Sequence, residues 1–267
     1  MRASGRRRRR LAATVRFAYL GSGSKGNAAL VEAGGTTVML DCGFSLAEAE
    51  SRLARLGRTP SDVDAIVVTH EHGDHIGGVA RFARRHRQPV WMTPGTWAAA
   101  RDRDIPDLRL FSCHESFALG ELELQPMPVP HDAREPCQFV FSDGARRLGS
   151  LTDAGHVTVH VARRLAACDA LVIECNHDID MLLEGPYPQR LKQRVVGQLG
   201  HLNNGQAREL VAALEPGRLQ HVVAVHVSEV NNTPALARGA LAAGLGCDAQ
   251  EIALACQTGG LNWLALR

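Results

Sequence analysis

The chain has 267 residues, of which 45% are hydrophobic and 22% are charged. A hydrophobic share of this size can bury a substantial core, which excludes a disordered chain, and no apolar run is long enough to span a membrane. The formal net charge is +2, but residues 1–10 contain six arginines and no acidic residue. Subtracting these six from 30 basic residues leaves 24 against 28 acidic residues, a net charge of −4 that gives no general argument for a nucleic-acid partner.

The arginine-rich N-terminus is set apart from the rest of the chain by its charge. We expect residues 1–14 to form a solvated, disordered tail and residues 15–267 to form the folded domain. Nucleic-acid binding by the tail and a misassigned start codon are the alternatives. No long apolar region or small-residue cleavage site follows the arginines, so the tail is not an export signal. Seven cysteines without a CxxC pair indicate reduced thiols and a cytoplasmic location.

Apolar patterns predict the elements of the first half. The pair Gly34–Gly35 predicts a hairpin, while Ser45 and Glu48 have the form of a capping box at the start of a helix that Gly57 ends. In chain order we expect strands over 15–20, 28–32 and 36–40, a helix over 45–57, a buried strand over 63–69, a helix over 76–87 and a strand near 90–92.

The second half predicts a further alternation of strands and helices, with a hairpin around Asp143–Gly144. The expected elements are a short helix near 95–100, strands near 108–111 and 119–127, strands 137–142 and 147–152, a helix over 156–167, a strand over 169–173, a helix after 204, a strand over 222–225, and closing strands over 252–254 and 263–266.

One order of elements occurs twice in the chain. Residues 37–43 and 148–155 each run as a strand into an Asp-x-Gly segment, and each is followed by a helix and a buried strand. Two such halves predict an α/β fold in which two mixed sheets pack face to face with helices outside, an αββα sandwich. Polar residues gather at the ends of the strands in both halves, so we expect a cleft there.

The strongest chemical signal directly follows the buried strand 63–69. There the sequence is Thr-His-Glu-His-Gly-Asp-His, which places His70, His72, Asp74 and His75 within six residues. Imidazole and carboxylate groups are suitable ligands for Zn²⁺ and similar divalent ions. The pattern therefore predicts a metal site, with surface histidines as the alternative.

This motif resembles that of the metallo-β-lactamase superfamily, and the other positions of that family's pattern follow in order. Asp41 matches the first aspartate, His131 the histidine after a proline-rich strand, Asp153 the bridging aspartate, and His226 the last histidine. The resemblance covers about residues 15–267 and implies a hydrolase domain with the αββα sandwich fold.

The resemblance implies two divalent metal ions, with Zn²⁺ expected first and Mn²⁺ or Fe compatible with the carboxylates. One ion takes His70, His72 and His131, the other takes Asp74, His75 and His226, and Asp153 bridges them. Asp74 is also expected to take part in catalysis. Asp41 is expected to orient ligands without being one, and the alternative is that it only caps a strand.

Two further residues resemble the acid–histidine pair of the phosphodiesterase branches. Glu174 ends the strand after Asp153, and His201 precedes a helix. In those branches such a histidine, assisted by a carboxylate, protonates the leaving oxygen, so His201 would be the general acid and Glu174 its partner. The alternative is that His201 caps its helix.

Three segments, residues 21–27, 200–204 and 226–232, narrow the resemblance to the YycJ-type subfamily, which is associated with 5′→3′ exonuclease activity on DNA. Backbone N–H groups in the first loop could hold a phosphate, although a Gly/Ser loop is often only a turn. The asparagines of the last segment could orient substrate or form turns. The predicted substrate-binding residues are Ser22, Ser24, Lys25, Asn27, Asn231 and Asn232.

The expected function is a two-metal phosphodiesterase or 5′→3′ exonuclease that acts on DNA through a hydroxide bridging the metals. Two alternatives stay open: hydrolysis of a small thioester, lactone or cyclic phosphodiester at the same site, and a metal-binding regulatory protein with little turnover. Arg134, Arg190, Lys192 and Arg194 could form a positive groove or a solvated face. The sequence leaves the oligomeric state open.

Overall fold

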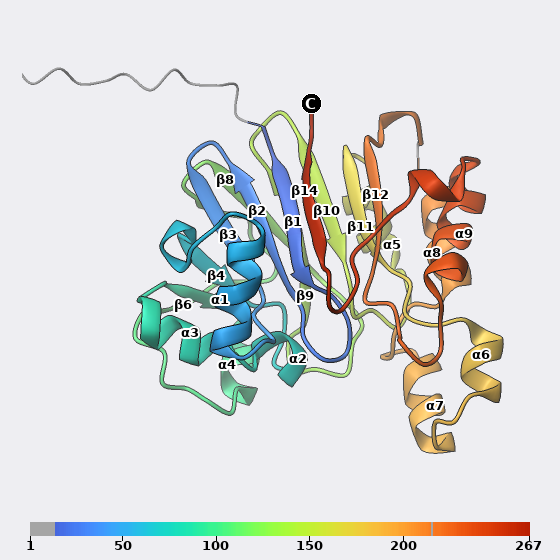
Figure 1. Ribbon diagram of the computed structural model, residues 1–267, viewed down its shortest axis with the longest axis horizontal. Helices are drawn as coiled ribbons and strands as arrows, with labels where there is room; N and C mark the ends of the chain where they lie inside the picture. Colours follow the sequence, from blue (N-terminus) through green and yellow to red (C-terminus); the bar gives the residue numbers. More distant parts are fainter. Residues whose placement is uncertain (1–13, 215) are drawn as a thin grey trace, which may run out of the picture.

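Two seven-stranded sheets pack face to face in the computed structural model, which describes residues 14–214 and 216–267. Helices cover the outer face of each sheet (Figure 1). This arrangement is the αββα sandwich expected from the repeated strand–helix–strand order. The predicted N-terminal tail, apart from Thr14, lies outside the described residues.

The first sheet has the strand order β14-β1-β2-β3-β4-β5-β6. Strands β1 to β3 pair antiparallel, and the hairpin at Gly34–Gly35 joins β2 to β3 as predicted. Strands β3 to β6 pair parallel. The bounds are β1 (Arg16–Gly21), β2 (Ala28–Ala33), β3 (Thr36–Leu40), β4 (Ala65–Val67), β5 (Val90–Met92), β6 (Leu108–Leu110) and β14 (Leu261–Ala265).

The second sheet has the order β13-β12-β11-β10-β9-β8-β7, with β10 to β13 parallel. The expected strand 119–127 is instead a hairpin of two strands, because Gly120 takes a positive φ of 54° that reverses the chain. The bounds are β7 (Phe117–Leu119), β8 (Leu122–Pro128), β9 (Cys137–Ser142), β10 (Arg147–Leu151), β11 (Ala170–Glu174), β12 (His221–Val225) and β13 (Ala253–Leu254).

The helices largely follow the predicted positions, with one division. The expected helix 76–87 is the shorter α3, and a separate helix, α2, precedes it, because the N–H of Gly78 donates to the carbonyl of Cys42 and a Cβ at Gly78 would lie 1.9 Å from the carbonyl oxygen of Phe44. Helices α2, α6, α7 and α9 were not predicted. The α-helices are α1 (Leu46–Arg55), α2 (Gly73–Ile76), α3 (Val79–His86), α4 (Pro94–Ala99), α5 (Val159–Leu165), α6 (Ile179–Glu184), α7 (Gln189–Val196), α8 (Asn204–Ala212) and α9 (Pro234–Leu245). Three short 3₁₀ helices are η1 (Pro60–Asp62), η2 (Pro216–Arg218) and η3 (Ala249–Glu251).

Apolar side chains fill three layers of this sandwich. Phe17, Phe139 and Phe141 belong to the layer between the sheets, and two further clusters join each sheet to its covering helices. Burial on both faces explains why the central strands are continuously apolar. No helix in the described ranges combines the length and apolar character needed to cross a bilayer.

Candidate metal centre and active site

Five predicted site residues lie at the carboxyl ends of parallel strands. Asp41 follows β3, His70 lies just beyond β4, Asp153 follows β10, Glu174 ends β11 and His226 follows β12. Because these strands run parallel within each sheet, their carboxyl ends meet at one edge of the sandwich, the lower edge in Figure 1. The fold thereby brings together residues that are up to 185 positions apart, from Asp41 to His226.

Backbone strain marks the same edge. Among the non-glycine residues of the described ranges, four have positive φ, and three of these are Asp41 at 60°, Asp153 at 54° and His226 at 52°. Such conformations cost free energy outside glycine and gather at functional sites, where the surrounding structure holds them in place. Here they reverse the chain directly after three parallel strands.

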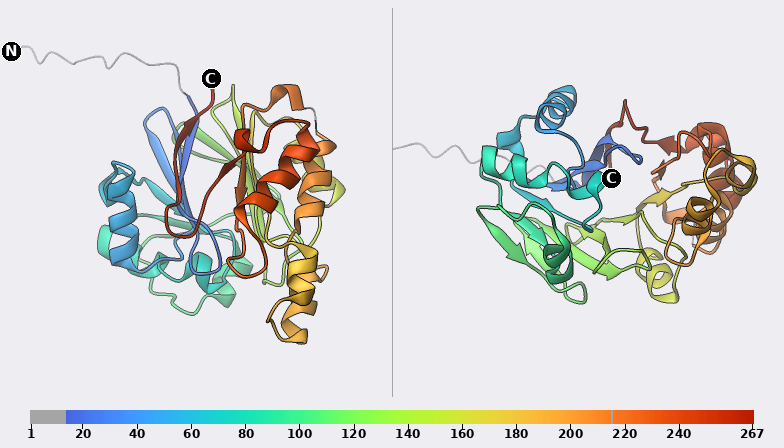
Figure 2. Two further views of the ribbon diagram at one scale, coloured as in Figure 1. Left: turned by 45° about the vertical axis from the view of Figure 1, so that its right-hand side comes forward. Right: turned by 90° about the horizontal axis from the view of Figure 1, so that it is seen from below.

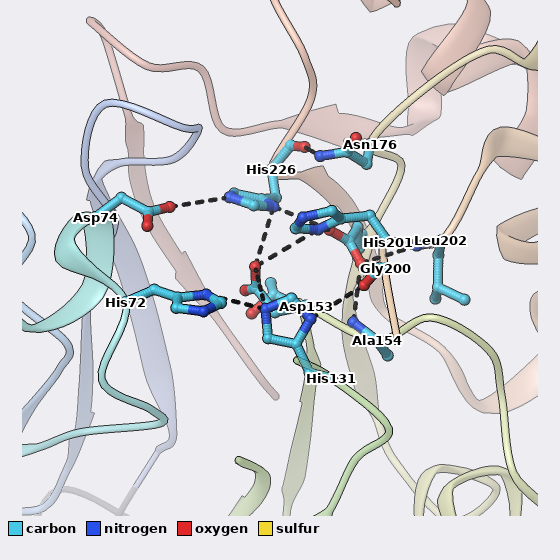
Figure 3. Close-up of polar contacts among 12 residues, drawn as sticks. His72, Asp74, His131, Asp153, Ala154, Asn176, Gly200, His201, Leu202 and His226 are labelled. Carbon is cyan, nitrogen blue, oxygen red and sulfur yellow. Dashed lines mark hydrogen bonds and ion pairs between the residues drawn. The ribbon is translucent and has the colours of Figure 1, made fainter. Parts of the chain in front are cut away.

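The first group of candidate ligands is a histidine triad. His70, His72 and His131 offer nitrogen atoms that lie within 4.8 Å of one another. Nε2 of His131 lies 3.2 Å from Nδ1 of His72 (Figure 3), and its Nδ1 lies 3.0 Å from the carbonyl oxygen of Gly200. Donation from Nδ1 to that carbonyl leaves Nε2 of His131 as an acceptor for a metal.

The second group contains Asp74, His75 and His226. Oδ2 of Asp74 lies 3.4 Å from Nε2 of His75 and 3.5 Å from Nε2 of His226. On its other side, the His75 ring has Nδ1 2.8 Å from Oδ2 of Asp41, which fixes the ring with Nε2 toward Asp74. All three donors lie within 4.8 Å of one another.

Asp153 lies between the two groups. Its Oδ2 is 3.3 Å from Nε2 of His75, and its Oδ1 is 4.0 Å from Nε2 of His131 and 3.5 Å from Nδ1 of His226. The carboxylate is 2% exposed. Among the residues that the structure describes, it is thus the acidic group within 4.0 Å of donors in both groups, and the bridging role itself stays a prediction.

Asp41 and Thr69 form hydrogen bonds with two of the candidate metal ligands. The Asp41 carboxylate accepts from the N–H and the hydroxyl of Thr69, each at 2.8 Å, in addition to its contact with His75. The Thr69 oxygen lies 2.9 Å from Nδ1 of His70. One buried carboxylate and one hydroxyl therefore orient two predicted ligands, a role that the sequence predicted for Asp41 and missed for Thr69.

The donor atoms lack the hydrogen bonds that buried polar atoms normally make. Nε2 of His70, Oδ2 of Asp153 and Nε2 of His226 are all buried without a hydrogen-bond partner among the described residues. Such atoms cost free energy unless something else satisfies them, and imidazole and carboxylate groups are suited to divalent cations. The residues present therefore fit divalent metal ions.

The charges of the site favour the same conclusion. Burial acts to raise the pKa of Asp153, but His226 and His75 outweigh it and hold that pKa well below the usual range. The pKa of Asp74 is lowered in the same way against burial by His226 and His75. Burial and the charge of His75 lower the pKa of His70. Ionised carboxylates and the neutral imidazole of His70 are the forms that bind cations. Burial acts to lower the pKa of His75 and of His226, but Asp153 and the other neighbouring carboxylates raise both, so these two rings must release a proton when they bind a cation.

Glu174 and His201 form the predicted pair beside these ligands. Oε1 of Glu174 lies 2.8 Å from Nδ1 of His201 and 2.9 Å from Nδ1 of His226. Oε2 accepts from the N–H groups of Ala154 and Leu202. The Glu174 side chain is fully buried and uses both oxygens, so it is held rigidly against two histidines.

His201 does not cap the following helix, because Asn203 is the N-cap of α8. Burial acts to lower the pKa of His201, but the charge and hydrogen bond of Glu174 outweigh it and raise that pKa. The side chain keeps 19% of its surface exposed and faces the cavity described next. It is thus the member of the pair that a substrate can reach.

A cavity of about 370 Å³ opens over this edge. Metal-ligand candidates and His201 lie on one side, and residues of α7 and the turn before it lie on the other. The lining residues are Ser24, His72, Gly73, Asp74, Asp132, Asp153, Asn176, Tyr187, Leu191, Arg194, Val195, Gly200, His201, His226 and Ser228.

Only part of the Gly/Ser loop, residues 21–27, lines this cavity. Ser24 lines it, and Lys25 pairs with Glu229 at 2.5 Å on the surface. Ser22 is buried, where its oxygen accepts from the N–H of His226 and lies 3.2 Å from Oδ1 of Asn27. Substrate binding by these residues stays a prediction.

The side-chain amide of Asn27 contacts two candidate metal ligands directly. Its Nδ2 lies 3.2 Å from Oδ2 of Asp74 and 3.1 Å from Nε2 of His75, and its backbone N–H donates to the carbonyl of Asp74. The sequence motif suggested a substrate contact, whereas the geometry places this amide against the metal-ligand candidates.

The two remaining predicted residues are buried outside the cavity lining. Asn232 forms a reciprocal pair of amide hydrogen bonds with Asn204, at 2.9 and 3.0 Å. The carbonyl of Asn231 accepts from the N–H of Asp178 at the start of α6. Asn232 thus links the loop after His226 to the segment after His201, and Asn231 links the same loop to the start of α6, while substrate binding by either asparagine is untested.

The outer wall of the cavity, formed by α7 and the turn before it, was mostly not predicted from the sequence. Tyr187 was not singled out, and of the four basic residues considered for a groove only Arg194 lines the cavity. Arg194 is engaged by Asp132, with Nε and Nη2 at 2.5 and 3.2 Å from its two carboxylate oxygens. The position of Asp132, directly after the predicted ligand His131, was a signal available in the sequence.

Comparisons with known proteins agree with this geometry. The model of the family described as a beta-lactamase superfamily domain matches residues 36–227. Exodeoxyribonuclease WalJ of Streptococcus pneumoniae is 33% identical over 228 residues, which cover 83% of this chain and 85% of that protein. Exodeoxyribonuclease YycJ of Bacillus anthracis is also 33% identical over 228 residues, covering 84% of this chain and 86% of that protein.

A solved structure shows the same fold at low sequence identity. The metallo-beta-lactamase fold protein YhfI of Bacillus subtilis matches with a TM-score of 0.73 and 14% identity, over 95% of this chain and 100% of that chain. The family match spans both halves of the ligand cluster, from the strand before Asp41 to His226. The chain therefore belongs to the β-lactamase superfamily.

Proposed function

We propose that this protein is a metal-dependent phosphodiesterase that acts as a 5′→3′ exonuclease on DNA. The observation that carries the proposal is the buried Glu174 carboxylate holding His201 at the cavity, directly beside Asp153 and His226. A proton donor at this place is what departure of an alkoxide from a phosphodiester requires. The names of the two exodeoxyribonuclease relatives, each matched over more than four fifths of its length, support DNA as the substrate.

Two divalent ions, which we propose to be Zn²⁺, complete the site. The ligands would be His70, His72 and His131 for one ion, Asp74, His75 and His226 for the other, and Asp153 for both. When bound, such ions supply Lewis-acid stabilisation of phosphoryl oxygens and activation of water. Asp41, Thr69 and Asn27 hold the ligand side chains in position through the hydrogen bonds described above.

His201 delivers the proton in this proposal. Its Nδ1 donates to Oε1 of Glu174, so the proton available to the substrate is the one on Nε2. The negative charge of Glu174 stabilises the imidazolium until the proton leaves. The substrate would lie with its scissile phosphate over Asp153, within reach of His201 on one side and of α7 on the other.

The location of the protein is part of the same proposal. All seven cysteines are free in the structure, and five of them are buried, as suits reduced thiols. We propose that the protein acts on DNA in the cytoplasm.

A substrate panel with metal analysis tests the function. The purified protein is expected to contain two Zn²⁺ per chain by elemental analysis and to release mononucleotides from 5′-phosphorylated single-stranded DNA. S-lactoylglutathione, a lactone and a cyclic nucleotide are the matched alternative substrates. A higher kcat/KM on any of these three than on DNA would contradict the proposal, as would full activity of a protein freed of metal.

A further inference from the structure

Helices α6 and α7 form a wall that extends beyond the end of the β-sandwich (Figure 1, Figure 2). The turn between them is Gly185-Pro186-Tyr187-Pro188. The prolines on both sides of Tyr187 fix their own φ angles and restrict the residue before each of them. The backbone that carries Tyr187 is therefore conformationally restricted.

Contacts at both ends hold this wall against the catalytic residues. At the turn, a Cβ on Gly185 would lie 2.7 Å from Oδ1 of Asn231, so the two loops approach too closely for a larger residue. At the end of α7, the carbonyl of Val195 accepts from the N–H of His201 at 3.0 Å. The wall and the proposed proton donor thus belong to one connected piece of structure.

Tyr187 is unusual among the aromatic residues of the chain. Of the phenylalanine, tyrosine and tryptophan side chains in the described ranges, it alone lines the cavity. It is half-buried, and its hydroxyl makes no hydrogen bond within the part of the chain that the structure describes. Other half-buried rings, such as Trp263 and Trp97, have an arginine side chain over one face. A ring in this position offers a free apolar face to whatever enters the cavity.

Arg194 lines the same side of the cavity. Asp132 engages its Nε and Nη2 atoms, which leaves Nη1 without a hydrogen bond among the described residues, and 56% of the side chain is exposed. Asp132 holds the guanidinium in a fixed orientation, while the remaining N–H groups can bind an anion. Arginine is well suited to phosphate oxygens because its donors are planar and permanently charged.

We propose that Tyr187 and Arg194 form a nucleotide subsite opposite the metal-ligand cluster. The Tyr187 ring stacks on the nucleobase of the terminal nucleotide, and Arg194 binds the phosphate at the 5′ end of the strand. This inference rests on the proposed function and adds to it how the strand end is recognised. A volume of about 370 Å³ is near the lower end of ligand pockets, which suits a single nucleotide.

The stacking is tested by combining a change in the protein, at Tyr187, with a change in the substrate, loss of the terminal base. The substrates are two 5′-phosphorylated single strands that differ only at the terminal nucleotide, which carries a base in one and is abasic in the other. On the normal strand, Tyr187→Ala is expected to lower kcat/KM by about tenfold to a hundredfold, the range of base–aromatic stacking. Tyr187→Phe is expected to retain the wild-type value. On the abasic strand, wild type and Tyr187→Ala are expected to be equal.

A binding measurement gives a readout independent of turnover. With 2-aminopurine as the terminal base and a slowly cleaved phosphorothioate at the terminal linkage, binding to wild type is expected to quench the fluorescence. Tyr187→Ala is expected to abolish the quenching. For the second residue, Arg194→Ala is expected to remove the preference for a 5′-phosphate over a 5′-hydroxyl, whereas Arg190→Ala, on the same helix but away from the cavity, retains it.

The outcomes separate the two proposals. If the wild-type protein does not cut DNA, the proposed function fails. If it cuts DNA, and Tyr187→Ala lowers kcat/KM equally on the normal and abasic strands or not at all, the proposed subsite is wrong while the proposed function stands. If wild type shows no preference for a 5′-phosphate, the role of Arg194 is overturned. Circular dichroism and metal content of each variant confirm that the fold is retained.

Discussion

Oε1 of Glu174 lies 2.8 Å from Nδ1 of His201 at the floor of the cavity. The same oxygen is 2.9 Å from Nδ1 of His226, a candidate metal ligand. One fully buried carboxylate thus orients the proposed proton donor and a proposed ligand together. A change at Glu174 must therefore disturb both parts of the site, whereas a change at His201 removes only the proton donor.

The first prediction separates proton donation from the rest of catalysis. His201→Ala is expected to lower kcat on DNA by about a hundredfold to ten-thousandfold, the usual contribution of a general acid. On bis-p-nitrophenyl phosphate the loss is expected to stay below about tenfold, because p-nitrophenolate leaves without protonation. His114→Ala, an exposed histidine outside the cavity lining, is the control. An equal loss on both substrates would show that His201 is not the acid.

The second prediction concerns the bridging carboxylate. Asp153→Asn is expected to reduce bound metal measured by elemental analysis and to abolish cleavage of DNA, because an amide is a weaker ligand than a carboxylate. Asp143→Asn, in the turn between β9 and β10, is the matched control and is expected to behave as wild type. Full metal content with full activity in Asp153→Asn would remove the bridge from the mechanism.

Metal removal gives the third prediction. A ligand that binds the native state and not the unfolded state stabilises the protein, so treatment with a chelator is expected to lower Tm and abolish activity. Addition of Zn²⁺ is expected to restore both. An unchanged Tm after complete removal of metal, shown by elemental analysis, would contradict a metal site formed from these buried donors.

Thr69 gives a fourth prediction, about a residue that touches no substrate. Thr69→Val keeps the side-chain shape but removes the oxygen that lies 2.8 Å from Asp41 and 2.9 Å from His70. We expect metal affinity to fall by about tenfold to a hundredfold, as for other groups that orient ligands. Thr69→Ser keeps the hydroxyl and is expected to restore the affinity. Competition with a chromophoric chelator measures both, and equal affinities of the two variants would refute the role.

His177 gives a prediction about pH and stability. Its ring is fully buried, and neither ring nitrogen has a hydrogen-bond partner in residues 14–214 and 216–267, so burial lowers its pKa to about 4. In the unfolded chain the pKa is about 6.5. The native state therefore binds fewer protons, and the free energy of unfolding is expected to fall as the pH drops from about 6.5 to about 4, by about 3 kcal/mol in total.

Comparison with His177→Leu isolates this contribution from the other histidines. Urea unfolding of both proteins at several pH values between about 7.5 and 4 gives two curves of stability against pH. The wild-type curve is expected to fall more steeply through this interval, because leucine cannot take up a proton. Parallel curves would show that His177 does not titrate as its burial predicts.

The ligand cluster was predictable because much of it is local in sequence. His70, His72, Asp74 and His75 occupy a single loop after a strand whose continuous apolar run marks it as buried. The distant members, such as His131, each end a strand, and the repeated strand–Asp-x-Gly–helix pattern predicted two sheets whose carboxyl ends meet. The folded structure brings those ends together, through parallel pairing for β3, β4 and β10 to β12 and through the antiparallel pairs β8–β9 and β9–β10 for the strand before His131.

The outer wall was not predictable in this way. Helix α6 has six residues, too few to show a helical period, and Tyr187 lies between two prolines in a turn. The division between α2 and α3 likewise depends on the close approach of Gly78 to Phe44, a tertiary contact that local propensity does not contain. Asn27 belongs to a common Gly/Ser loop, and only the folded structure places its amide against Asp74.

The segment from Ile179 to Val196, which comprises α6 and α7, contains none of the seven proposed metal ligands and none of the groups described above as orienting them. Its length and composition can therefore change without rebuilding the metal centre. Insertion, deletion or exchange of this hairpin of helices offers evolution and protein engineering a way to redirect the enzyme toward another strand end or a smaller molecule.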